Sequence, residues 1–242
     1  MNLRESKLFT TPIAHRGLHD EEAPENSLAA FSKAIEGGYC IETDVRLIDD
    51  GTVIVFHDNK LARVTGADGY ANNLKKSDLD EIRLGGTDEK IPTFERFLEE
   101  INGKTPILVE IKNEAKVGEL ERKTLEMLSA YNGEFAVQSF NPYSIEYFKK
   151  HAPDITRGIL SCYFEGVELA WYKKWLLKRL KLNKVAKPDF VSYEFRRLPN
   201  KYVTKAALPT LAWTLHDNTE TETVLPYCDN IIFEGFIPKI DK

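Results

Sequence analysis

Short apolar segments alternate with longer segments of helical periodicity along almost the whole chain. The apolar segments are rich in β-branched residues and are bounded by turn-forming residues, which is typical of buried strands. We expect strands at residues 11–15, 40–47, 53–57, 106–111, 135–140, 156–161, 190–194, 209–215 and 230–234. We expect helices at residues 27–37, 93–102, 118–131, 142–150, 167–183, 199–206 and 218–225. This alternation predicts an α/β fold with a mainly parallel sheet.

One of the nine predicted strands is the return strand of a hairpin. Asp50-Gly51 is a strong turn signal, and it separates the apolar segments 40–47 and 53–57. The eight strands that remain are the number that closes a parallel barrel. A chain of 242 residues also has a usual length for such a barrel. We therefore predict a TIM (β/α)8 barrel that forms a single domain over residues 1–242.

The segment from about residue 58 to residue 92 does not fit this alternation. Its pattern is too irregular for one barrel helix, so we interpret it as a small insertion after the second strand, over the barrel mouth. Active sites of such barrels lie at the carboxyl ends of the strands. Six chemically notable residues fall late in their predicted strands or just after them: His15, Glu42, Asp44, Glu110, Ser139 and Trp213. Their positions predict one site at the barrel mouth.

Two carboxylates in the second predicted strand are candidates for a metal site. Glu42 and Asp44 are two residues apart, so their side chains project from the same face of a strand. Carboxylate oxygens suit hard cations such as Mg²⁺ or Ca²⁺. The predicted hairpin brings His57 back near both carboxylates, while His15 and Arg16 follow the first strand. Two histidines, a cation site and an arginine are the equipment for metal-assisted phosphodiester cleavage.

The motifs around these residues resemble the signature of the glycerophosphodiester phosphodiesterase family. The dense part covers residues 13–66 and contains HRG, PENS, IETDV, DG and HD in the family's order. It continues with Ile91-Pro92-Thr93-Phe94, Val109-Glu110-Ile111-Lys112, Gln138-Ser139-Phe140-Asn141-Pro142 and Ala212-Trp213-Thr214. The chain is more distantly similar to phosphatidylinositol-specific phospholipase C. Because the motifs extend over nearly the whole chain, they are much more specific than a lone HRG or HD.

The resemblance implies the catalytic groups and the cofactor. It makes His15 and His57 the acid/base pair of the reaction. It makes Glu42, Asp44 and Glu110 the ligands of a divalent metal ion. Mg²⁺ or Ca²⁺ is the expected cofactor, because all three ligands are carboxylates.

Four further matched residues are expected to contact the substrate. The resemblance implies that Arg16 and Lys112 face phosphate oxygens and that Trp213 lines the pocket, and we place Phe140 beside it. The alternative for the two aromatic residues is a plug in the top of the barrel. Glu110 and Lys112 share one face of a strand, so a buried ion pair is an alternative for them that is compatible with function.

The chain departs from the family pattern in two places. Cys40 stands near a position that is usually acidic or small, and the last strand ends in Glu234 where a Thr-Asp pair is frequent. The second departure changes the residues that the last strand is expected to present to the substrate, and it leaves the expected metal site unchanged. Two other residues keep two interpretations each. Asn26 either caps the first helix or belongs to the site, and His216 either lines the pocket or serves no site.

Charge and cysteine content restrict the expected environment. The net charge of −5 argues against nucleic acid as a main partner. Three cysteines, Cys40, Cys162 and Cys228, are odd in number and lack metal-ligand spacing, which favours a reducing compartment. No stretch has the length and apolarity of a membrane span, and the first residues lack the apolar run of a signal peptide. We expect a cytoplasmic protein of undetermined oligomeric state.

The expected activity is hydrolysis of small-molecule glycerophosphodiesters to glycerol 3-phosphate and an alcohol. One histidine would act as base and the other as acid, and the sequence does not decide which starts as base. The alternative is a related phospholipase C- or D-type phosphodiesterase that acts on lipids at a membrane surface. A non-catalytic metal- or phosphate-binding barrel is disfavoured, because no expected histidine or carboxylate is missing.

The family pattern does not explain the segment 171–187. It carries seven basic residues and no acidic residue, although the whole chain is acidic. On a helical wheel of about 100° per residue, its aromatic residues and leucines fill roughly half of the circumference and its lysines most of the rest. One interpretation is a barrel helix with its tryptophans packed over the core. The other is weak peripheral contact with an anionic membrane surface.

Overall fold

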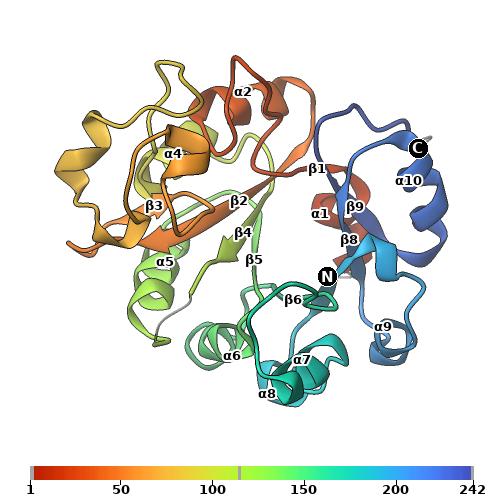
Figure 1. Cartoon of the computed structure of the whole chain (residues 1–242). Helices are drawn as coiled ribbons and strands as arrows, with labels where there is room; N and C mark the ends of the chain where they lie inside the picture. The colour runs from red at the N-terminus through yellow and green to blue at the C-terminus, as the bar shows by residue number, and fades with distance from the viewer. Residues whose placement is uncertain (1–2, 114–115, 241–242) are drawn as a thin grey trace.

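The computed structural model describes residues 3–113 and 116–240. Within this part of the chain, eight parallel strands form a closed ring, because β1 pairs with both β2 and β9 (Figure 1). The ring strands are β1 (Ile13–Ala14), β2 (Cys40–Leu47), β4 (Ile107–Ile111), β5 (Phe135–Ser139), β6 (Arg157–Ser161), β7 (Phe190–Glu194), β8 (Thr210–Leu215) and β9 (Asn230–Phe233). The predicted TIM barrel is confirmed.

Helices surround the ring and connect its strands (Figure 1). They are α2 (Leu28–Glu36), α4 (Phe94–Ile101), α5 (Glu119–Ser129), α6 (Pro142–His151), α7 (Trp171–Lys178), α8 (Asn183–Ala186), α9 (Lys201–Ala206) and α10 (Asn218–Val224). Short 3₁₀ helices are η1 (Leu3–Glu5), η4 (Phe195–Arg197) and η5 (Leu225–Tyr227). Apolar faces of the helices pack on the outward-facing strand residues, as Phe31 and Phe97 do in the largest core cluster. This packing fixes the strands that carry the site.

The predicted hairpin is present. β3 (Val53–Val55) runs antiparallel to β2, with Val45 paired to Val55. The turn places Gly51 at a φ of 81°, which glycine adopts readily because it has no Cβ. After β3 the chain stays beside β2, since the Phe56 N–H donates to the Asp44 carbonyl over 3.0 Å. His57 therefore returns to the carboxyl end of β2.

The segment between β3 and α4 forms a small layer of its own. It contains α3 (Ala62–Thr65), η2 (Ala71–Asn73) and η3 (Lys76–Asp80). Its apolar side chains form a separate cluster that includes Ile54 and Phe56 from the hairpin. This segment corresponds to residues 58–92, which the sequence pattern left outside the barrel.

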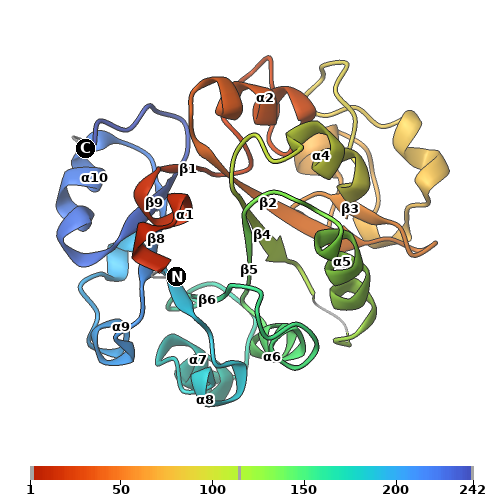
Figure 2. The ribbon, with the colours of Figure 1, turned by 180° about the vertical axis from the view of Figure 1, so that it is seen from behind.

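A short amino-terminal helix closes the other end of the ring. In α1 (Lys7–Thr10), Leu8 and Phe9 pack with residues near the amino ends of the strands. The rings of Phe9 and Phe190 meet edge to face with centroids 5.5 Å apart. Figure 2 shows α1 in front of the ring, on the side away from the viewer of Figure 1. The barrel is thus sealed by apolar side chains at one end and carries its polar residues at the other.

The predicted helix at 167–183 is wrong in its extent. The structure divides this segment into α7 and α8, and Leu180 between them has a φ of 54°. The Tyr193 hydroxyl donates to the Lys178 carbonyl over 2.8 Å, so tertiary contact satisfies a backbone group that a longer helix would use. The helical wheel drawn over 171–187 therefore does not hold beyond Lys178. No helix in the described residues is both long and apolar enough to cross a membrane.

Candidate active site

A pocket of about 160 Å³ lies at the carboxyl ends of the strands. Its lining residues are His15, Arg16, Glu42, His57, Glu110, Lys112, Gln138, Phe140, Leu160, Trp213, Thr214 and Ile232. Eight of the nine residues predicted for the site are among them. The ninth, Asp44, is buried next to Glu42 and Glu110. The structure therefore brings all nine residues together at the expected end of the barrel.

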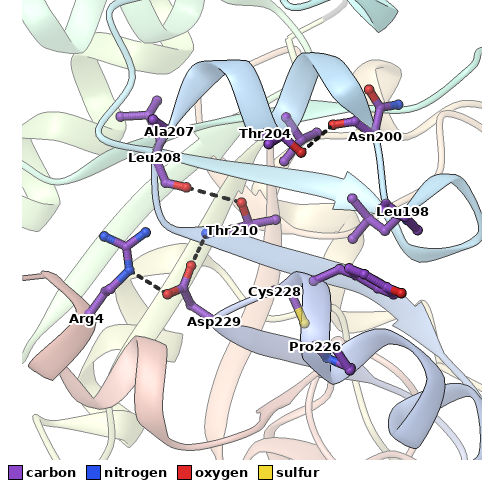
Figure 3. A pocket seen from close by; sticks show the side chains of 13 residues that line it. Arg4, Leu198, Asn200, Thr204, Ala207, Leu208, Thr210, Pro226, Cys228 and Asp229 are labelled. Carbon is purple, nitrogen blue, oxygen red and sulfur yellow. Dashed lines mark hydrogen bonds and ion pairs between the residues drawn. The ribbon is translucent and has the colours of Figure 1, made fainter.

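A larger hollow of about 540 Å³ lies elsewhere, beside the amino end of β8 (Figure 3). Its charged lining residues are Arg4 and Asp229, whose side chains pair with each other over 2.6 Å. Asp229 also accepts a hydrogen bond from the Thr210 N–H. The hollow has neither histidines nor a carboxylate cluster among its lining residues. Despite its size, we do not assign the reaction to it.

Three carboxylates meet on β2 and β4. The parallel pairing sets Asp44 opposite Glu110, and Glu42 lies on the same face of β2 as Asp44. One oxygen of each carboxylate lies within 4.8 Å of the others, and all three side chains are buried. The Asp44 Oδ1 atom has no hydrogen-bond partner, and Lys112 Nζ lies 3.7 Å from it, so this buried oxygen is only partly compensated. This set of oxygen donors fits a hard divalent cation.

Two basic side chains compensate part of this negative charge. Arg16 Nε lies 3.3 Å from Asp44 Oδ2, and Lys112 Nζ lies 2.9 Å from Glu110 Oε1. Burial, Asp44 and Glu110 raise the pKa of Glu42 well above its ordinary value. Burial opposes ionisation of Asp44, but Lys112 and the neighbouring cations hold its pKa below the ordinary value. With all three carboxylates ionised, one negative charge is left; a divalent cation would leave one positive charge for a phosphodiester anion.

His15 is fixed by a carboxylate at the end of β9. Its Nδ1 lies 2.5 Å from Glu234 Oε2. This hydrogen bond lowers the pKa of Glu234 to about 2, so the carboxylate is ionised and the Nδ1–H donates. The other ring nitrogen, Nε2, lies 4.0 Å from Glu42 Oε2. Burial lowers the pKa of His15, so the ring is kept neutral and its Nε2 can accept a proton.

His57 has the same kind of support, from the residue that follows it in the chain. Its Nδ1 lies 2.6 Å from Asp58 Oδ1, and Arg63 Nε holds Asp58 Oδ2 over 2.6 Å. Burial lowers the pKa of His57 to about 4. Arg63 also pairs with Glu25, which pairs with Arg16 over 2.8 Å. This chain of charges links the segment after β3 to the phosphate-binding candidate Arg16.

Asn26 supports the acidic cluster. The helix cap of α2 is Ser27, whose hydroxyl accepts from the Ala30 N–H. Asn26 Nδ2 instead donates to Asp44 Oδ2 over 3.0 Å, and its Oδ1 accepts from the Thr43 hydroxyl over 2.9 Å. Of the two interpretations of Asn26, the structure supports the one that places it in the site.

Aromatic side chains form one wall of the pocket. The rings of Phe140 and Trp213 meet edge to face with centroids 5.5 Å apart. Phe164, in the loop after β6, contacts Phe140 on its other side at 6.0 Å. Trp213 Nε1 is buried without a hydrogen-bond partner, so it is available to donate to a bound molecule.

Two supporting carboxylates were not assigned from the sequence. Glu234 was noted only as a departure from the family pattern, and Asp58 only as part of the HD motif. Glu234 could have been assigned only from the closed barrel. In that barrel β9 pairs with β1, and His15 directly follows β1. His19 Nε2 lies 3.6 Å from Glu234 Oε1, outside the acidic cluster. His216 is exposed and is not a lining residue, so the structure does not place it in the pocket.

Comparison with known proteins agrees with this geometry. A model of the glycerophosphoryl diester phosphodiesterase family matches residues 15–233. A glycerophosphodiester phosphodiesterase of Caldanaerobacter subterraneus subsp. tengcongensis is 33% identical over 174 residues, which cover 67% of this chain and 70% of the relative. Human lysophospholipase D GDPD1 is 30% identical over 144 residues, covering 54% of this chain and 45% of that protein.

Solved structures show the same fold. An Oleispira antarctica phosphodiesterase in complex with the product sn-glycerol-3-phosphate has a TM-score of 0.80 at 24% identity, over 95% of each chain. A glycerophosphodiester phosphodiesterase of Thermotoga maritima has a TM-score of 0.70 at 25% identity, over 92% of this chain and 94% of the other. Because the family match extends over most of the chain, the chain belongs to the glycerophosphoryl diester phosphodiesterase family and is a phosphodiesterase.

Proposed function

We propose that the chain hydrolyses glycerophosphodiesters to glycerol 3-phosphate and an alcohol, using a divalent metal ion and the pair His15 and His57. One observation carries the proposal. Both imidazole rings line the pocket of the buried acidic cluster, and each is fixed through Nδ1 by a carboxylate. Their Nε2 atoms are then left for proton transfer in the same pocket. The names of the Caldanaerobacter and Oleispira proteins support the substrate class.

Arg16 and Lys112 are the proposed phosphate-binding residues. Both now lie against the acidic cluster, at 3.3 Å and 2.9 Å from its oxygens. Glu42, Asp44 and Glu110 would hold the metal ion, Mg²⁺ or Ca²⁺, which would supply positive charge to neutralise the phosphate. With the carboxylates compensated in this way, the guanidinium and ammonium groups can turn their donors to the phosphate oxygens.

The two histidines divide the proton transfers. One Nε2 takes the proton of the attacking oxygen, either water or the neighbouring glycerol hydroxyl. The other histidine must act as the imidazolium, with a proton on each ring nitrogen, and the negative charge of the bound phosphodiester would favour that form. Its Nε2–H gives a proton to the oxygen of the departing alcohol as the bond from that oxygen to phosphorus breaks. If the glycerol hydroxyl attacks, a cyclic phosphate forms, and water then opens it to glycerol 3-phosphate. Glu234 and Asp58 keep a proton on Nδ1 of each ring, which leaves Nε2 as the nitrogen that takes or gives the reacting proton.

Pocket size favours a small substrate. About 160 Å³ is below the roughly 300–1,000 Å³ that encloses drug-sized ligands. A glycerophosphate group fits this scale better than an enclosed phospholipid. The alternative is hydrolysis of lysophospholipids, whose acyl chain would lie outside the pocket, and it is supported by the name of the human relative.

The test is product analysis with purified protein after metal removal. Glycerophosphocholine, glycerophosphoethanolamine and lysophosphatidylcholine are each assayed with chelator, and then with Mg²⁺ or Ca²⁺. We expect glycerol 3-phosphate and the free alcohol from the first two, with metal present. The variant His15→Ala/His57→Ala serves as the control for contaminating activity. Release of phosphocholine, or full activity in chelator, would contradict the proposal, and a preference for lysophosphatidylcholine would select the alternative.

We also propose a cytoplasmic location, because the three cysteines form no disulfide bond. Cys40, Cys162 and Cys228 are all free thiols. Burial raises the pKa of Cys40 and of Cys228 to about 12, so neither is a reactive thiolate. Free thiols persist in a reducing compartment. Fractionation of cells that produce the protein would test the location.

A further inference from the structure

The helix α7 is poorly covered by the rest of the molecule. None of its eight residues is buried. Trp171 is 79% exposed, the highest value among the exposed large hydrophobic residues of the described chain. Tyr172 and Trp175 are 49% and 39% exposed, and Val167 in the preceding loop is 44% exposed. Isolated exposed hydrophobic residues are ordinary, but four within nine positions form a patch that needs an explanation.

The aromatic side chains of α7 lie together on its exposed side. Two hydrogen bonds attach its carboxyl end to the barrel: the Ser161 hydroxyl donates to the Leu177 carbonyl over 3.0 Å, and the Tyr193 hydroxyl donates to the Lys178 carbonyl. At about 100° per residue, Trp171, Tyr172 and Trp175 share one arc of about 100°. The expectation that the tryptophans pack over the core is therefore wrong.

Positive charge surrounds this aromatic arc. Residues 171–187 contain Lys173, Lys174, Lys178, Arg179, Lys181, Lys184 and Lys187, and no acidic residue. Within residues 3–113 and 116–240, none of these lysines forms an ion pair with a carboxylate. Arg179 is occupied by stacking on Trp175, at 4.6 Å from the ring centroid. Since the whole chain carries −5, this excess of positive charge is local.

The patch begins at the wall of the active-site pocket. The loop before α7 leaves the carboxyl end of β6 and carries Phe164, which is buried against Phe140. Phe140 in turn contacts Trp213. Aromatic side chains therefore extend from the pocket wall into the loop that leads to the exposed helix. Figure 1 shows α7 below the ring. The patch and the pocket mouth lie on the same end of the barrel.

We propose that residues 167–187, named here the α7 surface, bind the headgroup region of an anionic lipid bilayer. This surface carries seven basic residues against one acidic residue, the exposed Glu168. Trp171 and Trp175 enter the interface, where tryptophan is favoured because it has both an apolar body and a polar N–H. The surrounding lysines approach the anionic headgroups. Binding in this way would bring the rim of the pocket close to the membrane surface, because Phe164 and Phe140 link the loop before α7 to the pocket wall.

The positive charge of the α7 surface favours an anionic membrane, rather than a second copy of the chain, as its binding partner. A symmetric dimer through the α7 surface would bring two clusters of seven basic residues together, which is repulsive. An anionic bilayer supplies the opposite charge over an area large enough for the whole surface. Single-stranded nucleic acid also offers negative charge and stacking, so it is included as a competitor in the test.

The experiment measures co-sedimentation of the full chain with vesicles of phosphatidylglycerol or phosphatidylcholine at low and moderate salt. We expect binding to phosphatidylglycerol vesicles that weakens with salt, and a blue shift of tryptophan emission. Trp171→Ala/Trp175→Ala should weaken binding by roughly tenfold or more, and so should Lys173→Glu/Lys181→Glu. Matched controls are Tyr143→Ala/Tyr227→Ala, which removes exposed aromatic rings elsewhere, and Lys7→Glu/Lys76→Glu, which makes the same change of charge elsewhere.

Three outcomes would overturn the proposal. They are no binding to phosphatidylglycerol vesicles at low salt, equal loss of binding in the control variants, and concentration-dependent dimers that Trp171→Ala/Trp175→Ala abolishes. Preferential binding of single-stranded nucleic acid in competition with vesicles would also replace it. All readouts are independent of catalysis, so failure here leaves the proposed function untouched. Hydrolysis of glycerophosphocholine in solution should be unchanged in Trp171→Ala/Trp175→Ala.

Discussion

Two imidazole rings in this site are fixed by the same device, a carboxylate on Nδ1. The two carboxylates lie at very different distances along the chain from their histidines. Asp58 follows His57 directly, whereas Glu234 is 219 residues away from His15. Neighbouring residues such as His57-Asp58 can be recognised from a motif. The His15–Glu234 pair depends on closure of the barrel, which sets the end of β9 beside the end of β1.

Removing either histidine should abolish most of the activity while leaving the fold intact. We expect His15→Ala and His57→Ala each to lower kcat by about 10²–10⁴-fold, because each removes one of two proton transfers. Circular dichroism should be unchanged. His216→Ala is the matched control, since His216 is exposed and is not a pocket residue. Near-normal turnover in either variant would remove that histidine from the mechanism.

Glu234 is expected to act through His15. Glu234→Gln keeps the size of the side chain but no longer requires the Nδ1–H tautomer, because an amide can donate as well as accept. We expect kcat to fall by roughly 10–100-fold with little change in KM, which is the usual effect of losing a residue that orients a site ligand.

A double-mutant cycle separates this positioning role from a general loss of structure. In the His15→Ala background, Glu234→Gln should have almost no further effect on kcat. Glu165→Gln is the control, since its carboxylate is largely exposed and pairs with Arg197 away from the pocket. If the two changes multiplied independently, Glu234 would not act through His15.

The strands β2 and β4 build the acidic cluster through their register. Spacing within β2 was enough to predict that Glu42 and Asp44 face the same way. The third carboxylate, Glu110, could be assigned only by family resemblance, because the pairing of Asp44 with Glu110 is set by strand register. The break after α7 could not be predicted either. No glycine or proline marks it, and side chains of β6 and β7 bind the last carbonyls of the helix.

If this strand pair holds a metal ion as proposed, Glu42→Gln should change the stability of the protein with metal far more than its stability without metal. Because the pKa of Glu42 is raised, its carboxyl group tends to hold a proton when no cation is bound. Glutamine imitates that protonated form and can still accept from the Arg16 N–H. We therefore expect the free energy of unfolding in chelator to change by less than about 1 kcal/mol.

Added Mg²⁺ or Ca²⁺ should raise the melting temperature of the parent protein, since a ligand that binds only the folded state stabilises it. In Glu42→Gln this rise should be much smaller at the same metal concentration, and activity should need more metal. Thermal melts with chelator and with metal would measure both effects. The control is Glu95→Gln on α4, which changes the charge by the same amount away from the cluster. An equal rise in both proteins would exclude Glu42 as a ligand.

The whole molecule separates its polar and apolar ends. The sequence predicted the number of strands, the hairpin and the position of the site, because these depend on local periodicity and turn residues. It did not predict α1, since four residues carry no periodicity, and yet Leu8 and Phe9 seal the end of the barrel that faces away from the site. We propose that residues 1–242 fold as one cooperative unit, which requires this sealed end.

Phe9→Ala tests that cooperative unit without touching the chemistry. Phe9 is 3% exposed and contacts the ring of Phe190, so truncation should leave a cavity and lower the free energy of unfolding by about 3–5 kcal/mol. Tyr143→Ala, which removes a ring that is 53% exposed, should change it far less. Urea unfolding followed by circular dichroism and by tryptophan fluorescence should give one coincident transition in each protein. The kcat of folded Phe9→Ala should equal that of the parent, because the pocket lies at the opposite end of the strands. Two separate transitions would show instead that the amino-terminal seal and the barrel mouth unfold independently.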